Sequence, residues 1–332
     1  MRISVALCTY NGEKYLPEQL ESIKRQTRQP DEMIVCDDGS VDHTWDILQT
    51  FRKSSPFPVQ VHRNKNNLGS TKNFEKAVRL CNGDIIALSD QDDIWKPHKL
   101  ERIEDIIRKA PNAGYVFTDA DVVDENLNPL GYSLWESAGF QGHFFEMFSR
   151  GQQTLCFMKK QFVTGATMAF RASLRDLVIP FPDDAFWVHD YWIAVCLSSC
   201  GANGMPISEK LIRYRRHSDQ QIGVSPPGKT KSSFKEYLDF PKMKINLWEG
   251  WLRWGESCLY LKRSLETVKN DNCDTSGLQL LEQFEMHFSN RKLIHSQKGF
   301  SRLKPVLAEM MSGRYGLFSN SWKSAFRDLF LN

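Results

Sequence analysis

The chain has 332 residues, of which 41% are hydrophobic and 25% are charged, and its formal net charge is only +3. This composition is ordinary for a globular protein and excludes low-complexity and disulfide-scaffold classes, because a chain of this length buries a core without covalent staples. No uninterrupted apolar run reaches the ~20 residues of a membrane-spanning helix, so we expect no transmembrane segment.

The eight cysteines are spread along the chain, with neither Cys-x-x-Cys pairs nor the spacing of a zinc site. We therefore expect reduced, structural thiols in a cytoplasmic protein. Met1 and Arg2 lead directly into a strand pattern, which predicts that no signal peptide is present.

The N-terminal part of the chain alternates short apolar runs with helical patterns. Residues 3–8 predict a buried strand, and apolar residues then recur at helical spacing over 16–23. The alternation continues with predicted strands at 32–36, 59–62 and 85–88 and predicted helices at 45–51 and 71–80. Strands that alternate with helices indicate βαβ units and a mostly parallel, doubly wound α/β sheet.

The second half of the chain mixes strands and helices less regularly. Predicted strands lie at 114–118, 165–170 and 211–214, and an apolar helix is predicted at 190–199. The Pro- and Gly-rich stretch 225–229 is the clearest linker, and the pattern beyond it is helical and rich in aromatics. We therefore predict a catalytic or binding domain at 1–224 and a helical C-terminal region at 225–332.

Polar clusters follow three of the predicted strands, at 9–11, 37–40 and 90–93. In doubly wound sheets, ligands bind beyond the carboxyl ends of the strands. We therefore expect these clusters to share one site.

The run Asp90-Gln91-Asp92-Asp93 is the strongest chemical signal. Its carboxylates repel one another unless a cation neutralises them, and Mg²⁺ or Mn²⁺ takes one or two carboxylates together with substrate phosphates. The sequence predicts a divalent metal that bridges to a diphosphate. The alternative is an acidic helix start before Pro97, where carboxylates favour the helix dipole.

Four motifs in this order resemble family-2 glycosyltransferases of the GT-A fold: Ile3-Ser-Val-Ala-Leu-Cys-Thr-Tyr-Asn-Gly, Val35-Cys-Asp-Asp-Gly-Ser-Val-Asp, Asn67-Leu-Gly-Ser-Thr-Lys-Asn and Leu88-Ser-Asp-Gln-Asp-Asp-Ile-Trp. The resemblance spans about residues 1–222. It implies a nucleotide-sugar donor, and that Asp90 and Asp92 form the metal-binding pair.

The same resemblance assigns the nucleotide site. It implies that Cys8, Thr9, Tyr10 and Asp38 hold the base and ribose, with backbone contact at Cys8, where the family often has proline. Lys72 lies in the loop that neighbours the nucleotide and is a phosphate candidate. Asp38 has an alternative role, because Asp-Asp-Gly-Ser is also a turn in which a carboxylate satisfies backbone N–H groups.

A hydroxyl acceptor needs a base within hydrogen-bond reach, and Asp190 matches the acidic position that the family has at a helix start. Its neighbour His189 stands where Glu is commoner. The alternative for Asp190 is a helix N-cap. Trp187 and Trp192 are sugar-stacking candidates or core aromatics, and Gly165 lets the backbone approach a sugar or simply makes a tight turn.

The segment Tyr214-Arg-Arg-His resembles the family's Tyr-Arg-x-His loop. By resemblance, His217 reaches the metal or diphosphate, and Arg215 or Arg216 meets the charge of the leaving group. Asp93 is a weaker candidate for the diphosphate or acceptor. Surface salt bridging is the alternative for the two arginines.

Charge is concentrated in the tail, because residues 291–327 hold eight basic residues and one acidic residue. A basic, aromatic-rich helical stretch predicts peripheral contact with an anionic membrane, and packing on the first domain or a homodimer interface is the alternative. No nucleic-acid-reading motif accompanies the charge, so we expect no nucleic-acid partner. P-loop, Rossmann and Gly-x-Ser-x-Gly motifs are absent from the sequence.

Together these features predict an inverting, metal-dependent glycosyltransferase. The overall resemblance is closest to bacterial rhamnosyltransferases of surface polysaccharide assembly, which implies dTDP-rhamnose as donor and a glycan or lipid-linked saccharide as acceptor. Three alternatives stay open: another donor such as a UDP-hexose, a nucleotidyltransferase, and a non-catalytic nucleotide-sugar or glycan-binding module.

Overall fold

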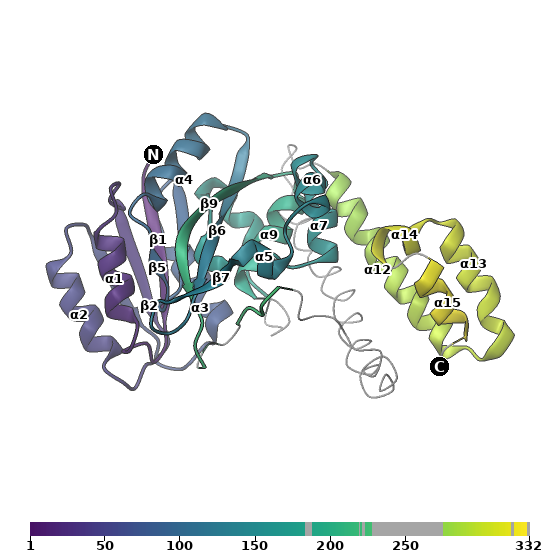
Figure 1. Ribbon diagram of the computed structural model, residues 1–332, viewed down its shortest axis with the longest axis horizontal. Helices are drawn as coiled ribbons and strands as arrows, with labels where there is room; N and C mark the ends of the chain where they lie inside the picture. Colours follow the sequence, from purple (N-terminus) through teal and green to yellow (C-terminus); the bar gives the residue numbers. More distant parts are fainter. Residues whose placement is uncertain (183–187, 219, 221–222, 228–274, 320–321, 331–332) are drawn as a thin grey trace. The chain divides into compact units, whose positions relative to one another are not determined.

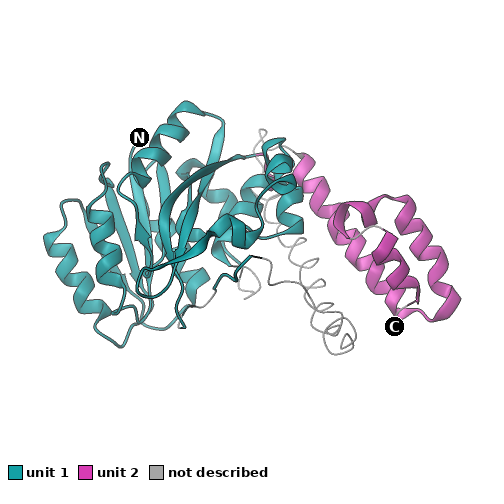
Figure 2. Ribbon diagram, in the orientation of Figure 1, with its two compact units in different colours: residues 1–198, 202–229 teal, residues 199–201, 230–332 magenta. Residues whose placement is uncertain are grey.

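The computed structural model describes residues 1–182, 188–218, 220, 223–227, 275–319 and 322–330. The chain divides into two compact units, Met1–Ser198 with Ala202–Lys229, and Ser199–Gly201 with Thr230–Asn332 (Figure 2). Each unit is described by itself below.

The first unit is built on one mixed sheet with helices on its faces (Figure 1). The strand order is β3-β2-β1-β4-β8-β6-β9-β5, and β7 pairs with β6. The strands are β1 Ile3–Thr9, β2 Glu32–Asp37, β3 Val59–Arg63, β4 Ile85–Ser89, β5 Ile94–Trp95, β6 Ala113–Val123, β7 Pro129–Ser133, β8 Met168–Arg171 and β9 Asn203–Arg215.

Strand direction separates two regions of the sheet. β1 pairs in parallel with β2 and β4, and β2 with β3, as the alternation of strands and helices predicts. β8 is antiparallel to both β4 and β6, whereas the long pairing of β6 with β9 is parallel again. The α/β fold is therefore confirmed, with antiparallel pairings at β8, β5 and β7.

Helices connect the strands of the first unit: α1 Leu16–Lys24, α2 Thr44–Ser54, α3 Ser70–Leu80, α4 Lys99–Lys109, α5 Leu134–Ala138, α6 His143–Ser149, α7 Gln153–Lys159, α8 Arg175–Val178 and α9 His189–Ser199. Every residue of β1 and β4 is buried, because helices cover both faces of a parallel sheet. Burial of these apolar strands is the main stabilising term for this unit.

Three predicted strand boundaries are wrong, among them the end of β6, which runs to Val123 and not to the predicted 118. Residues 165–167 form the 3₁₀ turn η1, Gly165–Thr167, and strand β8 begins only at Met168. β9 starts at Asn203, well before the predicted 211, because its first half pairs with β6 although its sequence alternates with polar residues.

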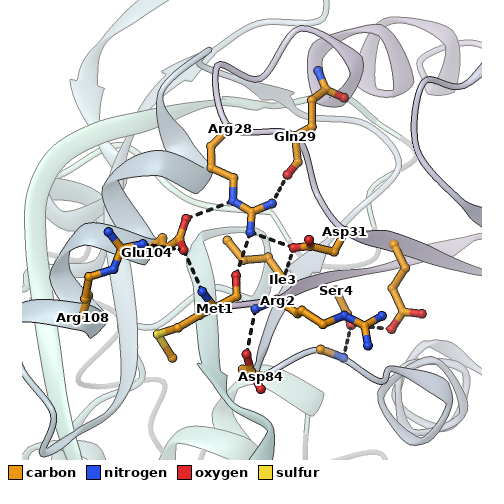
Figure 3. Close-up of polar contacts among 12 residues, drawn as sticks. Met1, Arg2, Ile3, Ser4, Arg28, Gln29, Asp31, Asp84, Glu104 and Arg108 are labelled. Atoms are coloured by element: carbon orange, nitrogen blue, oxygen red, sulfur yellow. Dashed lines mark hydrogen bonds and ion pairs between the residues drawn. The ribbon is translucent and has the colours of Figure 1, made fainter.

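A polar network fixes the amino-terminal end of β1, at the edge of the sheet away from the strand-end clusters (Figure 3). Arg28 donates from Nε to Glu104, at 2.9 Å, and from Nη2 to Asp31, at 2.7 Å. Asp31 in turn accepts a 2.7 Å hydrogen bond from the backbone N–H of Ile3. The network therefore ties the start of β1 to α4 and to the loop before β2.

The described part of the second unit is helical, with α12 Thr275–Ser296, the 3₁₀ turn η3 Gly299–Arg302, α13 Leu303–Met311, α14 Arg314–Phe318 and α15 Trp322–Phe330. Ile294, Val306, Tyr315 and Ala325 form its buried cluster. Among the residues described in either unit, no helix combines the length and apolar character needed to cross a bilayer.

Candidate functional site

The first two strand ends are joined by direct hydrogen bonds. Thr9 ends β1 opposite Asp37 at the end of β2, and its hydroxyl donates to Asp37 Oδ1 at 3.1 Å. The backbone N–H of Asp38 donates to the carbonyl of Thr9 at 2.8 Å. The predicted nucleotide residues Thr9 and Asp38 therefore lie side by side.

Gln91 ties the acidic run after β4 to the loop after β1. Its side-chain Oε1 accepts from the N–H of Tyr10 at 2.9 Å, and its Nε2 donates to the carbonyl of Tyr10 at 3.0 Å. A Cβ at Gly12 would lie 2.2 Å from Gln91 Oε1, so a side chain at this position would displace the amide. Tyr10 itself is exposed, which leaves its ring available to a ligand.

The Asp38 carboxylate is buried and organises the loop before α3. It accepts from Asn64 Nδ2 at 2.7 Å and from the backbone N–H groups of Leu68 and Gly69 at 2.8 and 2.9 Å. Asp38 therefore satisfies backbone N–H groups as the alternative role expects, but in the loop before α3; within its own turn it is Asp37 that accepts, from the N–H of Ser40 at 3.1 Å. Base recognition by Asp38 stays a prediction.

Cys8 and Lys72 border the same region. Burial raises the pKa of the Cys8 thiol well above its usual value, so this side chain stays neutral. Its backbone lies beside Cys36 in the β1–β2 register, and contact of this backbone with a nucleotide stays a prediction. The Lys72 ammonium lies 3.1 Å from a Glu75 carboxylate oxygen and donates to the carbonyl of Phe181. A phosphate would have to compete with these partners.

Burial and neighbouring carboxylates raise the pKa of two aspartates in the acidic run. Burial, followed by the charges of Asp92 and Asp190, raises the pKa of Asp90 well above its usual value. Burial, followed by the charges of Asp92 and Asp90, does the same for Asp93. Asp93 Oδ1 accepts from the N–H of Arg215 at 3.0 Å, whereas its buried Oδ2 has no hydrogen-bond partner among the described residues.

A buried lysine faces this acidic run. The ammonium of Lys99 donates to the carbonyl of Ala166 at 2.6 Å and lies 3.4 Å from the ring centroid of Trp95. Burial lowers the pKa of Lys99 well below its usual value, and the charges of Asp93 and Asp90 oppose that shift. Lys99 is therefore a buried cationic group on which the charges of the acidic run act.

Asp92 and His217 form a pair that fits a hard cation. His217 Nε2 lies 2.9 Å from Asp92 Oδ2, and the histidine ring packs 4.6 Å from that of Tyr15. The described residues contain no group of three or more His, Cys, Asp or Glu side chains arranged around a metal. The pair, with repelling carboxylates beside it, fits a cation that takes its remaining ligands from phosphate oxygens.

Asp190 lies in the first turn of α9 and is buried. Its Oδ2 accepts from the backbone N–H of Gly165 at 2.8 Å. Because the charge of Asp190 acts on Asp90, the predicted base and the predicted metal ligands belong to one electrostatic cluster. Its Oδ1 accepts from the N–H of the next residue, Tyr191, at 2.6 Å, which is a local contact inside α9 and not an N-cap bond.

His189 explains why position 165 is glycine. The His189 ring stacks on Phe74 with centroids 3.7 Å apart, and a Cβ on Gly165 would lie 2.4 Å from His189 Nε2. Burial lowers the pKa of His189, so its ring is neutral, and neither ring nitrogen has a hydrogen-bond partner in the part of the chain described. Gly165 thus makes room for the imidazole; its approach to a sugar stays a prediction.

The two arginines of the Tyr-Arg-Arg-His segment differ in their surroundings. Arg215 is buried, donates from Nε to the carbonyl of Asp92 at 2.8 Å and forms an ion pair with Glu18. Arg216 donates from Nη1 to the Tyr132 hydroxyl at 3.1 Å. Arg215 therefore supports the acidic run from inside the protein and makes a salt bridge to Glu18, while contact of either arginine with the leaving group stays a prediction.

Of the two tryptophans considered for sugar stacking, only Trp192 lies in the described structure. Trp192 is buried, and its indole N–H donates to the carbonyl of Val178 at 2.7 Å. Its ring belongs to the core, which corrects the expectation that it stacks on a sugar. Trp187 lies outside the described residues.

Sequence reasoning missed Gln91 and Lys99. The Gln91 amide contacts backbone, which no residue pattern records. Lys99 follows Pro97 at the start of α4, where a lysine ordinarily faces solvent. A signal for Lys99 was nonetheless available, because three carboxylates near one strand end require compensating positive charge.

Comparison with known proteins decides the family. Residues 4–178 match the model of glycosyl transferase family 2. The chain belongs to this family. An uncharacterized glycosyltransferase from Nostoc sp. is 26% identical over 65% of this chain and 65% of its own length, so the match spans just under two thirds of that relative. The dTDP-rhamnosyl transferase RfbG from Shigella flexneri is 27% identical to this chain, over 68% of this chain and 76% of the length of RfbG.

A solved structure supports the same fold. TarS 1–349 from S. aureus, in complex with UDP-GlcNAc, superposes with a TM-score of 0.56 at 18% sequence identity. The alignment covers 99% of the transferase chain and 82% of the TarS chain. The predicted GT-A type of α/β fold is thereby confirmed.

Proposed function

We propose that this transferase moves a sugar from a nucleotide-sugar to an acceptor hydroxyl with inversion at the anomeric carbon. Asp190 is the proposed base. The observation that carries the proposal is the buried Asp190 carboxylate, whose charge acts on Asp90 of the acidic run. A base beside a diphosphate-binding edge is the arrangement that hydroxyl attack on a nucleotide-sugar requires.

In the proposed reaction, the acceptor oxygen forms a bond to the anomeric carbon while the bond from that carbon to the diphosphate breaks. The hydroxyl proton passes to Asp190, and the electron pair of the broken bond leaves with the nucleoside diphosphate. Asp90, Asp92 and His217 would hold a divalent cation, which would supply positive charge to that leaving group. A single displacement of this kind inverts the anomeric configuration.

The donor end of the site is assigned to the strand ends of β1 and β2. Tyr10 is exposed and offers its ring to the nucleotide, and the backbone at Cys8 and Thr9 borders the same edge. Asp38 orders the Asn64–Gly69 loop over this region through its three hydrogen bonds. Lys72, at the start of α3, is the proposed phosphate contact.

We propose dTDP-rhamnose as the donor and a saccharide of a surface polysaccharide as the acceptor. The similarity to the dTDP-rhamnosyl transferase RfbG supports the donor. Similarity to the abequosyltransferase RfbV of Salmonella typhimurium, 37% identical over 28% of this chain, and to the chondroitin synthase of Escherichia coli, 35% identical over 40%, supports a role in polysaccharide synthesis. We also propose that residues 1–224 carry catalysis and that 225–332 contact the acceptor or its surroundings in the cytoplasm.

A panel of nucleotide-sugars tests the donor. With Mn²⁺ or Mg²⁺ present, the correct donor should raise the melting temperature, because ligand at about 100 times its Kd adds about 2.7 kcal/mol to stability. We expect dTDP-rhamnose to give the largest increase and to lose it with a chelator. A larger increase in melting temperature with a UDP-hexose would identify the UDP-hexose as the donor in place of dTDP-rhamnose. Stabilisation by a nucleoside triphosphate, together with release of pyrophosphate, would indicate a nucleotidyltransferase instead.

A further inference from the structure

Helix α15 carries a row of large apolar side chains that face solvent. Trp322, Phe326 and Phe330 follow one another at four-residue spacing, and each is more than half exposed. Side chains at this spacing lie on one face of a helix. The opposite face holds the buried residues Ala325 and Asp328. The exposed face is therefore an apolar surface that the described chain leaves uncovered.

The elements packed beside α15 also carry exposed apolar side chains. Turn η3 and helix α13 each contact α15 and one another. Phe300, in η3, is 95% exposed, and Met311, at the end of α13, is 88% exposed. Leu303 and Leu307 are exposed on α13. We name the outward faces of η3, α13 and α15 the basic apolar surface; an exposed patch of this kind marks an interaction site.

The charge on this surface has one sign. Lys298, at the N-cap of η3, is exposed, as are Lys304 on α13 and Lys323 on α15. The acidic residues between 296 and 330 are only Glu309 and Asp328, and both are buried. The described surface from 296 to 330 therefore presents lysines and apolar side chains without an exposed carboxylate.

Glu309 is held inside the bundle by fixed partners. Arg314 donates to both of its carboxylate oxygens, at 2.7 and 2.6 Å. His287 Nδ1 lies 2.7 Å from Oε1, and Asn290 donates to Oε2 at 2.9 Å. This carboxylate cannot turn outward without breaking a buried network, so it offers no compensation to the surface lysines.

Asp328 is held in the same way. Arg291 donates to both of its oxygens, at 2.6 and 2.9 Å, and the Tyr315 hydroxyl donates to Oδ2 at 2.6 Å. His295 Nε2 lies 2.9 Å from Oδ1. With both acids paired internally, the excess positive charge of the surface faces outward.

We propose that the basic apolar surface docks on an anionic lipid bilayer. Aromatic and aliphatic side chains enter the headgroup region, and the lysines meet lipid phosphates. Charge complementarity selects this occupant over a second copy of the chain, because two copies of one surface would bring lysines against lysines. The inference is independent of the sugar donor and of the role proposed for Asp190.

Sedimentation of the full chain with vesicles tests the proposal. We expect binding to vesicles of equal parts phosphatidylglycerol and phosphatidylcholine, weak binding to phosphatidylcholine alone, and weaker binding as salt is raised. Each lysine near an anionic surface contributes about fivefold to partitioning, so K298E/K304E/K323E should lose at least about tenfold. The variant W322S/F326S/F330S should lose at least as much, because it removes the inserted area.

The matched control is K53E/K109E/K159E, which reverses the same number of exposed lysines on the first unit. It should bind vesicles as the natural chain does, and melting curves should show all variants folded. Absence of binding to the anionic vesicles, or an equal loss in the control variant, would overturn the proposal. So would light scattering that shows a dimer which W322S/F326S/F330S converts to monomer, because the surface would then be an interface between copies.

Discussion

Single buried carboxylates do different work in this site. Asp38 accepts hydrogen bonds from the loop before α3. Asp93 accepts from the backbone N–H of Arg215, and Asp190 accepts from the backbone N–H of Gly165. Each fixes a neighbouring segment while it contributes negative charge. At these residues the structural role and the electrostatic role belong to one side chain, so a substitution must be designed to change one role and keep the other.

Asp38→Asn should lower stability and donor affinity together. An amide replaces one acceptor oxygen with a donor group, which cannot satisfy the N–H groups of both Leu68 and Gly69. We expect a loss of about 1–3 kcal/mol in the free energy of unfolding, measured by urea denaturation. Asp46→Asn, at an exposed carboxylate, is the control. Full stability with lost donor binding would instead assign Asp38 to base recognition alone.

The Gln91 amide and Gly12 form a pair whose coupling is measurable. Gly12→Ala puts a methyl group where Gln91 Oε1 lies, so the amide should release Tyr10 and donor affinity should fall about tenfold, comparable with losing one or two hydrogen bonds. Gln91→Ala should have a similar effect. The double variant should then be no worse than Gln91→Ala alone. Additive losses in isothermal titration with donor would show that the two positions act separately.

At the scale of elements, the bundle of the second unit is pinned by its two buried carboxylates. α15 is joined to α12 through Asp328 with Arg291 and His295. Asp328→Asn would remove the negative charge that pairs with the Arg291 guanidinium, and breaking a buried ion pair costs about 3–5 kcal/mol of stability. We expect faster hydrogen exchange throughout α12 and α15. Asp105→Asn, at a surface ion pair of α4, is the control and should leave exchange in the second unit unchanged.

Acid should weaken the same bundle. Burial alone would raise the pKa of Glu309, but hydrogen bonds from Arg314, His287 and Asn290 outweigh it and lower the pKa to about 2. An unfolded Glu titrates near about 4.3, so the stabilising contribution is complete above that pH and is lost as pH falls towards 2. Glu309→Gln should flatten this part of the stability profile. An unchanged acid slope would contradict the assignment.

Element-scale prediction from sequence succeeded where apolar pattern and burial coincide. The runs of β1 and β4 are buried along their whole length, so the pattern alone identifies them. β9 could not be bounded, because its first half alternates with polar residues and its pairing partner β6 lies far away in sequence. At the site, motifs grouped the strand ends correctly, but the contacts of Gln91, Lys99 and Arg215 depend on tertiary packing that motifs do not encode.

At the scale of the whole molecule, we assign different tasks to the two units. The first unit belongs to a known transferase family and holds the strand-end site. The second unit presents a surface of lysines and apolar side chains. Loss of membrane binding should therefore leave transfer to a soluble acceptor unchanged, and we expect K298E/K304E/K323E to retain full turnover in such an assay. Reduced turnover would place the second unit within the catalytic mechanism.

The central claim is that Asp190 takes the proton of the acceptor hydroxyl. The most direct test is Asp190→Asn, with sugar transfer measured in a single turnover and donor affinity measured in parallel. Loss of a general base costs about 10²–10⁴-fold in rate, and the amide keeps an oxygen that accepts from Gly165, so donor binding should persist. We predict transfer reduced by at least about 100-fold with donor affinity unchanged. Turnover at the natural rate in Asp190→Asn would contradict the account.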